Sequence, residues 1–331
     1  MEYLILIIPS SVITGFILDI IFGDPRRLRH PVRIMGSLAK KIEPAFRKPR
    51  AKKLSGLLFA LAIIICSGLC SAVILALPAI FLLHSRFAAM FFFFVLSSFI
   101  IYTCLALKDL KVQSLKVYRD LQNADIEAAR LSLSNIVGRD TSALGRENII
   151  RATVETIAEN SVDGVLSPLF YAFLGGPPLS MAFKAASTLD SMYGYRDGLN
   201  IYFGWASARI DDIANYIPAR LSALLIPLAS LVYGKGFLNP FKTVLKFRKN
   251  SPSPNSGIPE AAIAGALGLR LGGEDTYGEK KKIKPFIGDA TKGFDLKDII
   301  DSINIVYIFS ILSAIAGFLL FSATAALFFL K

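Results

Sequence analysis

Residues 303–330 read INIVYIFSILSAIAGFLLFSATAALFFL and contain no charged side chain. A helix that crosses the roughly 30 Å hydrocarbon core of a bilayer needs about 20 mostly apolar residues, because each residue adds about 1.5 Å. Residues 3–22, 54–83 and 87–107 meet the same requirement. These four stretches predict an all-α integral membrane protein that crosses the cell membrane several times.

Two further apolar stretches, residues 165–183 and 217–233, are shorter and contain proline and glycine. Each could span the bilayer, re-enter it, or lie buried against other helices. We therefore expect about four to six transmembrane or membrane-embedded helices in a single membrane domain over residues 1–331. The polar segments between them, expected to be helical cytoplasmic insertions, are residues 23–53, 108–163, 184–216 and 234–302.

The charge distribution indicates how the chain is oriented. The net charge is +12, and residues 23–53 alone hold eleven Lys or Arg against two acids. Such a patch can bind nucleic acid, but this one lies between two apolar stretches, as the positive-inside rule requires of a cytoplasmic loop. We expect no nucleic-acid partner, an outside N-terminus and a retained first span. The side on which residues 184–216 lie depends on whether both shorter stretches span.

The first polar motif is GDPRRLRHPVRIMG, residues 23–36. Its prolines restrict the backbone and favour a rigid turn. Asp24 is either a helix cap or a metal or substrate contact. His30 is either a structural hydrogen-bonding residue or a base, and Arg33 is a candidate phosphate contact, since guanidinium groups match phosphate geometry.

The second motif is RATVETIAENSVDGVLSPLFY, residues 151–171. The spacing predicts a helix over residues 148–160, with an apolar face on one side and Arg151, Glu155 and Glu159 on another. The oxygen-bearing candidates for a site are Glu155, Glu159, Asn160 and Asp163. Hard cations such as Mg²⁺ prefer these ligands and use few carboxylates when substrate phosphate is present. The alternative is a solvated stripe of ion pairs.

The third motif is KAASTLDSMYGYRDG (residues 184–198) followed by RIDDIANYIPARL (residues 209–221). The candidate residues are Asp190, Tyr193, Arg196, Arg209, Asp211, Asp212 and Asn215. If the second part is helical, Asp211 and Asn215 share a face beside Asp212. This pattern next to a membrane segment can hold Mg²⁺ against a phosphate or diphosphate. The alternative is an ion-pair network with the neighbouring arginines.

The fourth motif is NSGIPEAAIAGALGLRLGG, residues 255–273. Its proline and glutamate are typical of the first turn of a helix. Asn255 and Glu260 are expected to line a cleft, where helix N-terminal amides are available to an anion. The small residues 261–268 allow another backbone to approach closely, so simple helix packing is the alternative.

These four blocks, in this order and spread over most of the chain, resemble the CobD/CbiB family of adenosylcobinamide-phosphate synthases in cobalamin biosynthesis. Ser256 and Ile258 are small departures from the pattern. The sequence is also similar to AmpE-type membrane proteins. The CobD/CbiB resemblance implies an ATP-dependent amide ligation, in which adenosylcobyric acid is joined to (R)-1-amino-2-propanol O-phosphate, or a close amine phosphate, to give adenosylcobinamide phosphate.

The resemblance implies Mg²⁺ and ATP beside the corrinoid and amine phosphate substrates, and a site that faces the cytoplasm at the membrane surface. No Walker A or G-x-G-x-x-G motif is present, so a nucleotide would bind in an unusual way. The implied catalytic residues are Glu155, Glu260 and His30. The implied substrate contacts are Arg33, Asn160, Asp190, Tyr193, Arg196, Arg209 and Asn255. The implied metal ligands are Asp24, Glu159, Asp163, Asp211, Asp212 and Asn215.

Two other functions remain open from the sequence. The Asp211–Asp212 pair also suits an intramembrane prenyltransferase-like enzyme, although such enzymes usually carry two Asp-rich motifs. A non-enzymatic sensor or scaffold would use the polar blocks as ion-pair networks. The identity of the amine, a homo-oligomeric state and contact with other membrane enzymes of the corrinoid pathway are also left open.

Overall fold

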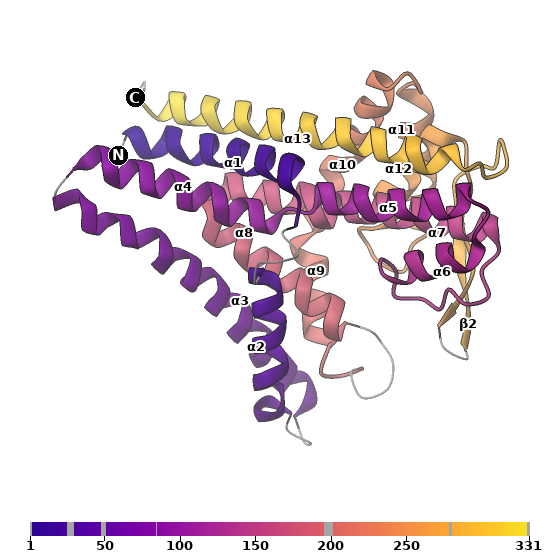
Figure 1. Cartoon of the computed structure of the whole chain (residues 1–331), viewed down its shortest axis with the longest axis horizontal. Coiled ribbons are helices and arrows are strands. Elements are labelled where there is room, and N and C mark those ends of the chain that lie inside the picture. Colours follow the sequence, from indigo (N-terminus) through magenta and orange to yellow (C-terminus); the bar gives the residue numbers. More distant parts are fainter. Residues whose placement is uncertain are drawn as a thin grey trace. The chain divides into compact units, whose positions relative to one another are not determined.

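The computed structural model describes residues 2–24, 30–47, 51–83, 85–194, 201–277 and 280–329. These residues are overwhelmingly helical, with one antiparallel pair of strands (Figure 1). Within the described ranges, four helical stretches are long and apolar enough to cross a membrane, and a fifth is added if one bent pair of helices counts as a span. The predicted class, a helical membrane protein, is therefore confirmed.

The candidate spans follow the apolar stretches of the sequence. They are apolar parts of the longer helical stretches Lys52–Ile80, Arg86–Gln122, Arg146–Tyr193 and Lys297–Ala323. The first, second and fourth contain most of the stretches predicted from composition, and residues 165–183 lie inside the third. Helix α1 (Glu2–Phe22) covers the predicted first span, but Ile7–Phe22 counts only as a shorter apolar helix and is not one of the four candidate spans. Residues 217–233 pass the test only together with the preceding helix, as the bent pair.

The chain divides into two compact units. The first unit comprises Met1–Ala106, Ser167–Ala214 and Ala314–Lys331, and the second comprises Leu107–Leu166 and Asn215–Ser313. Helix α13 (Lys297–Phe329) belongs partly to each. The other elements of the first unit are α1, α2 (Pro31–Phe46), α3 (Lys52–Ala76), the 3₁₀-helix η1 (Leu77–Leu83), α4 (Arg86–Cys104), α8 (Ser167–Tyr193) and α9 (Trp205–Ala214).

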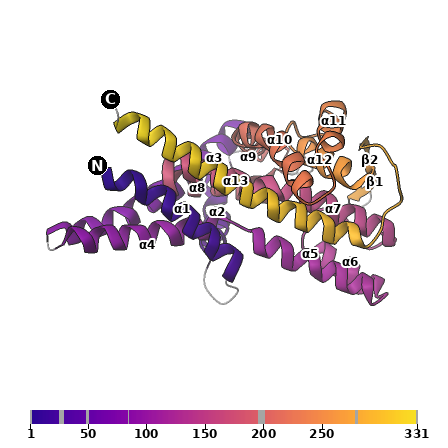
Figure 2. The same ribbon diagram turned by 90° about the horizontal axis from the view of Figure 1, so that it is seen from above.

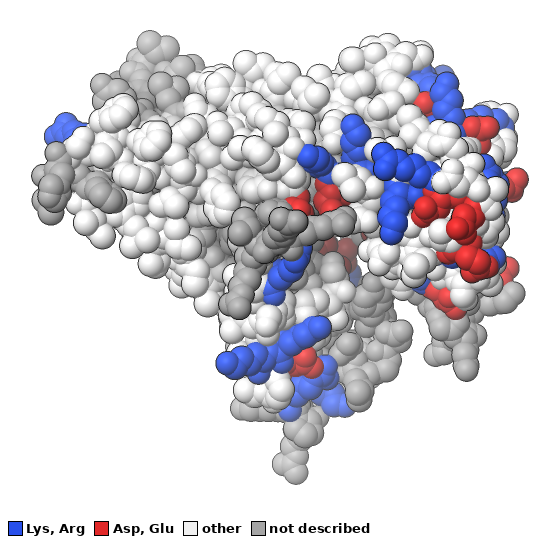
Figure 3. Space-filling view, viewed as in Figure 1, with Lys and Arg blue, Asp and Glu red and all other residues white. Residues whose placement is uncertain are grey.

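The first unit is a bundle in which α1 packs along α4 and α3 packs along α8 (Figure 1). Phe59 lies at its aromatic core, with ring centroids 5.3 Å from Tyr193 and 5.1 Å from Phe203. Outward positions of α3 stay apolar, and Leu69 is 60% exposed. In the space-filling view few charged side chains lie over α4 (Figure 3). Such a surface suits contact with lipid.

Glycine and proline interrupt the apolar stretch 165–183, for which the sequence left open whether it spans the bilayer, re-enters it or lies buried. Helix α8 contains two helical parts joined at Gly175 and Gly176, and Gly176 has a φ of 68°. Positive φ is strained for a residue with a Cβ. Pro177 and Pro178 then restart the helix, since proline is tolerated in a first turn.

The second unit contains the polar insertions. Its elements are α5 (Leu107–Gln122), α6 (Ile126–Ser134), α7 (Arg146–Ser161), the π-helix η2 (Val162–Leu166), α10 (Tyr216–Val232), α11 (Leu238–Phe247), α12 (Gly257–Leu267), β1 (Leu271–Tyr277), β2 (Lys280–Ile287) and the start of α13. Helix α7 confirms the helix expected over residues 148–160. Its apolar face, made by Ile150, Val154 and Ile157, is buried.

The hairpin of β1 and β2 was not predicted. Its strands pair Leu271 with Ile287 and Gly273 with Lys284, with an irregularity between Leu271 and Gly273. Gly, Asp, Glu and Lys are depleted in strands, so local propensity argued against this hairpin. The run Lys280–Lys282, expected to be a juxtamembrane solvated segment, lies in β2, and its side chains are outside the described set.

Helix α12 is buried almost all round because its residues are small. It packs against α11, its neighbour in Figure 2. At Gly265 an added Cβ would lie 2.5 Å from Thr243 Oγ1 and 2.8 Å from Pro240 Cα. The small residues therefore do what the sequence suggested, and let two backbones approach closely.

Replacing Gly265 with alanine should destabilise the protein by about 1–3 kcal/mol, because the added methyl group overpacks the α11–α12 contact. Thermal unfolding of the purified protein in detergent measures this. Gly293→Ala is the control, since nothing lies within 4 Å of its added Cβ. Equal melting temperatures for both variants would contradict the proposed packing.

Candidate functional site

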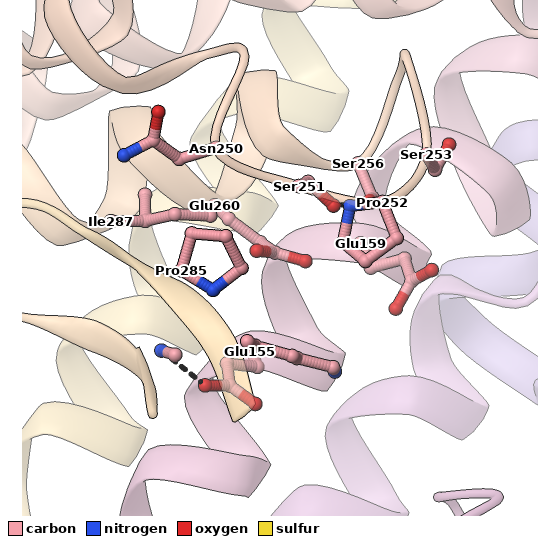
Figure 4. A pocket seen from close by; sticks show the side chains of 12 residues that line it. Glu155, Glu159, Asn250, Ser251, Pro252, Ser253, Ser256, Glu260, Pro285 and Ile287 are labelled. Carbon is pink, nitrogen blue, oxygen red and sulfur yellow. Dashed lines mark hydrogen bonds between the residues drawn. The ribbon is translucent and has the colours of Figure 1, made fainter. Parts of the chain in front are cut away.

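A pocket of about 200 Å³ lies within the second unit, and we call it the carboxylate pocket (Figure 4). Its lining residues are Glu155, Glu159, Asn250, Ser251, Pro252, Ser253, Ser256, Glu260, Gly272, Lys284, Pro285 and Ile287. Two of the four sequence blocks, residues 151–171 and 255–273, supply its acidic side chains. Segments that are far apart in the chain therefore build one polar site.

Helical periodicity places the three carboxylates. Glu155 and Glu159 are four residues apart on α7 and so lie on one face. Glu260 lies in the first turn of α12, where an acidic side chain interacts favourably with the helix dipole. In Figure 4, Glu159 and Glu260 extend their carboxyl groups into the pocket, whereas Glu155 turns toward the backbone nitrogen of Gly272.

Glu155 is anchored by two strong partners. It is 5% exposed, and its Oε2 lies 2.6 Å from Nη2 of the buried Arg139. The Gly272 N–H donates to its Oε1 at 2.9 Å. Gly272 has a φ of 83°, which favours glycine there. Glu155, which was expected to act as a base, thus also connects α7 to Arg139 in the preceding loop and to Gly272 in the hairpin.

Glu159 and Glu260 have no hydrogen bond or ion pair with another residue in the part of the chain that the structure describes. Burial raises the pKa of Glu260 well above its ordinary value, and the negative charges of Glu159 and Glu155 raise it further. Lys284 and Arg139 act in the opposite direction. Part of the Glu260 surface still faces the open pocket, so the group is accessible to a ligand.

The carboxylate oxygens of the pocket fit Mg²⁺ only if water and substrate phosphates supply the remaining ligands. Across the described ranges, no group of three or more His, Cys, Asp or Glu residues could hold a metal ion by itself. Mg²⁺ commonly binds one or two carboxylates and completes its shell with water and substrate phosphates. Glu159, whose carboxyl group reaches the open space of the pocket, fits that role.

Asn160 and Asp163 follow the pocket residues in sequence but do not line the pocket. The Asn160 side chain donates to the Thr156 carbonyl at 3.0 Å, a contact within its own helix. Asp163 lies in the π-helix η2, which directly follows α7. Short π-helical turns are frequent at functional sites, and the role of Asp163 as a metal ligand stays a prediction.

Asn255 and Asn215 are both buried in the second unit. The Asn255 Oδ1 accepts a hydrogen bond from Arg220 Nη1 at 2.7 Å, and Asn255 does not line the carboxylate pocket. Asn215 lies between α9 and α10, because α9 ends at Ala214 and α10 begins at Tyr216. The helix is therefore not continuous through residues 209–221, and the shared face of Asp211 and Asn215 stays a prediction.

In the first unit, Asp24 lies near His30 and Arg33. The His30 Nε2 is 3.5 Å from one Asp24 oxygen, and Arg33 Nη2 is 3.8 Å from the other. The His30 Nδ1 accepts from the Val32 N–H at 3.3 Å and so caps α2. The proton of a neutral His30 is then on Nε2, facing Asp24. The arrangement is consistent with a rigid, polar end of α1.

The third motif contributes structural contacts in the first unit. The Tyr193 hydroxyl donates to Glu43 Oε2 at 2.9 Å, and Asp190 lies one turn earlier on α8. Arg209 pairs with Asp212 at 3.1 Å on α9, which matches the ion-pair alternative. Asp211 is buried on the same helix. Arg196 lies outside the described residues.

Two residues that shape the pocket were missed from the sequence. Lys284 was grouped with a solvated basic run, but it lines the pocket from β2. Arg139, which has no motif around it, pairs with the lining residue Glu155. A signal for Lys284 was present, since Ile283 and Pro285 isolate it from the preceding lysines.

Together, these features define a polytopic helical membrane protein that has a carboxylate-lined pocket in its polar part. The chain belongs to the CobD/CbiB family, because the family model described as CobD/Cbib protein matches residues 12–306. The sequence resemblance is thereby confirmed.

Curated relatives agree with this assignment. The chain is 42% identical to the cobalamin biosynthesis protein CobD of Clostridium perfringens, over 94% of this chain and 97% of the relative. It is 43% identical to the protein of that name from Pelobacter propionicus, over 96% of each chain. Identity to the Leptospira interrogans protein is 39%, over 96% of this chain and 99% of the relative. No solved structure matches the chain.

Replacing Arg139 with methionine should destabilise the protein by about 3–5 kcal/mol, because Glu155 would stay buried without its cation. Thermal unfolding and the yield of folded protein in detergent measure the effect. The double variant Arg139→Met/Glu155→Met should recover much of the loss, since no unpaired charge remains. A single variant as stable as the wild type would show that the pair does not hold the pocket together.

Proposed function

We propose that this protein is an adenosylcobinamide-phosphate synthase of cobalamin biosynthesis. It joins adenosylcobyric acid to (R)-1-amino-2-propanol O-phosphate, or a close amine phosphate, with hydrolysis of ATP. The observation that carries the proposal is the carboxylate pocket, in which two of the blocks that define the family resemblance meet. The names of the curated relatives, cobalamin biosynthesis proteins, support the pathway.

The chemistry requires activation because a carboxylate is a poor acyl donor. An oxygen of the corrinoid carboxylate attacks the γ-phosphorus of ATP, ADP leaves, and an acyl phosphate forms. The amine nitrogen then attacks the acyl carbon, inorganic phosphate leaves, and the nitrogen loses a proton. A site for these steps needs groups that orient two anionic substrates and a base that accepts the proton.

The pocket residues can be assigned to these needs. Glu260 is the base, because a carboxylate whose pKa is raised binds a proton more readily than an ordinary one. Lys284 contacts anionic oxygens from the hairpin side. Glu159 would hold Mg²⁺, which when bound would neutralise phosphate charge. Glu155 keeps the walls of the pocket in place.

The size of the pocket limits what enters it. A volume of about 200 Å³ is below the roughly 300–1,000 Å³ of usual small-molecule sites. The corrin ring would therefore stay outside, and only the reacting arm and the amine would enter. We propose that the pocket faces the cytoplasm of a cell-membrane protein, as the basic segment 23–53 favours.

The candidate residues of the first unit keep their predicted roles as substrate or metal contacts. They include Asp24, Arg33, Asp190, Asp211 and Asp212. The test of the whole proposal is reconstitution of the purified protein with corrinoid, amine phosphate, ATP and Mg²⁺, with the product identified by mass. Product from a prenyl diphosphate, or corrinoid binding without any amide, would support one of the alternative functions.

Replacing Glu260 with glutamine should lower the rate of amide formation about 10²- to 10⁴-fold, the usual effect of losing a general base. The rate is measured in the reconstituted system. Glu127→Gln is the matched control, because its side chain is exposed and pairs with Arg130 on α6. A Glu260→Gln protein that is folded and fully active would exclude Glu260 as the base.

The pH profile should respond to Lys284. This lysine lowers the pKa of Glu260, so Lys284→Met should raise that pKa further. Because the base acts in its deprotonated form, the acid limb of kcat/KM should move to higher pH. Lys249→Met, an exposed lysine that does not line the pocket, should leave the limb in place. A shift to lower pH in Lys284→Met would contradict the assignment.

A further inference from the structure

A second, larger cavity of about 660 Å³ lies within the second unit, and we call it the arginine cavity. Its lining residues are Asp140, Ala143, Leu144, Glu147, Asn148, Arg151, Arg270, Gly272, Gly273, Glu274, Phe286, Ala290, Lys292, Gly293 and Phe294. Its volume falls within the roughly 300–1,000 Å³ of sites that bind small molecules. None of its charged residues was a candidate site residue in the sequence analysis.

Arg151 is the charged residue held in the wall of this cavity. It is 6% exposed and lies one helical turn before Glu155 on α7. Its Nη2 donates to the Glu274 carbonyl at 2.9 Å, which fixes the guanidinium against β1. A guanidinium has five donors in a planar fork, and the Glu274 carbonyl accepts from one of them.

Glycine lets Arg151 come this close to the hairpin. At Gly273 an added Cβ would lie 2.8 Å from Arg151 Nη1 and 3.1 Å from Phe286 Cε1. Gly273 also has a φ of 95°, a conformation that favours glycine. The backbone of β1 therefore serves as a support that orients a buried cation beside an aromatic ring.

The remaining charges of the cavity differ in exposure. Arg270 lies over the Phe286 ring at 4.4 Å, and Lys292 pairs with the buried Asp298. The acidic lining residues are Asp140, Glu147 and Glu274, and all three are exposed. Exposed charges are screened by water and salt, whereas a buried charge is screened much less. Arg151 is therefore the least screened of the charges that line the cavity.

The arginine cavity adjoins the carboxylate pocket. Gly272 lines both, and its N–H is the group that holds Glu155. A ligand bound by Arg151 would thus lie next to the wall that carries the three carboxylates. Such proximity is what a reaction between two bound substrates requires.

We propose that the arginine cavity binds a phosphate-bearing substrate, with Arg151 and Arg270 as its phosphate contacts. Arginine suits phosphate because two N–H groups can bind two oxygens at once. The identity of the ligand rests on the proposed function, which supplies two sources of this chemistry, ATP and the amine phosphate. The Phe286 ring suits a nucleobase, and the exposed carboxylates suit an ammonium group.

Isothermal titration calorimetry on the full-length protein in nanodiscs tests the site. One arm uses ATP with Mg²⁺ and, for comparison, adenosine. The other uses 1-amino-2-propanol phosphate and the unphosphorylated amine. The variants are Arg151→Gln, Arg151→Lys and Arg270→Gln. The matched control is Arg248→Gln, an exposed arginine that lines neither cavity.

One phosphorylated ligand should bind the wild type more tightly than its phosphate-free counterpart. Arg151→Gln should weaken that binding about 10- to 100-fold, the effect of losing a charged hydrogen bond, while Arg248→Gln leaves it unchanged. Arg151→Lys should recover part of the loss. If thermal melting shows that Arg151→Gln is unfolded, Arg270→Gln decides, because that side chain is exposed.

The deciding variant is Arg151→Gln if it folds, and Arg270→Gln otherwise. If that variant binds both phosphorylated ligands as tightly as the wild type does, the proposal is overturned. A wild type that does not distinguish either ligand from its phosphate-free form would also overturn it. The function has a separate readout, the amide product of the reconstituted wild type. Product without an Arg151 effect removes the cavity assignment alone, whereas an Arg151 effect without product removes the synthase assignment and leaves a phosphate-binding site.

Discussion

The pocket geometry depends on one buried ion pair, between Arg139 and Glu155. Removing two charges from water is costly, and this cost is offset only when both charges are fully partnered. Glu155 meets that condition with a guanidinium on one oxygen and the Gly272 N–H on the other. Those partners come from the segment before α7 and from the hairpin after α12. The pair therefore brings three distant segments together, and the two cavities form around it.

Because Glu155 is neutralised, Glu159 and Glu260 can stay without an ion-pair partner among the described residues. Three adjacent unpaired carboxylates would repel one another strongly. Arg139 and Lys284 reduce this repulsion, but burial and then the charges of Glu159 and Glu155 still raise the pKa of Glu260. The remaining negative charge makes the carboxylate pocket attractive to a cation or an ammonium group. The adjoining cavity has the opposite character, because its buried charge is Arg151. Neighbouring sites of opposite sign suit a reaction that brings an amine and phosphate groups together.

Sequence periodicity predicted the parts of this site that are helical. The apolar face of α7 and the i, i+4 spacing placed Glu155 and Glu159 on one side, and the proline before Glu260 marked the start of α12. The rest depends on tertiary contacts that local patterns do not encode. Lys284 enters the pocket from a hairpin whose residues have weak strand propensity. Asn255 turned toward Arg220, a partner far away in sequence. The break between α9 and α10 at Asn215 was not predicted either.

The membrane explains why the open carboxylates lie in the polar insertions. In hydrocarbon every polar group needs an internal partner, and an unpaired carboxylate is especially costly there. Two tyrosines of the first unit meet this constraint: the Tyr193 hydroxyl donates to Glu43, and the Tyr102 hydroxyl donates to the Gly23 carbonyl. A reactive base or a metal ligand must instead keep an oxygen lone pair available for the proton or the metal ion. Such a group is sustainable only where water or substrate reaches it. In the second unit Glu260 meets that requirement, because its helix is buried among small residues while its carboxyl group faces a pocket open to solvent.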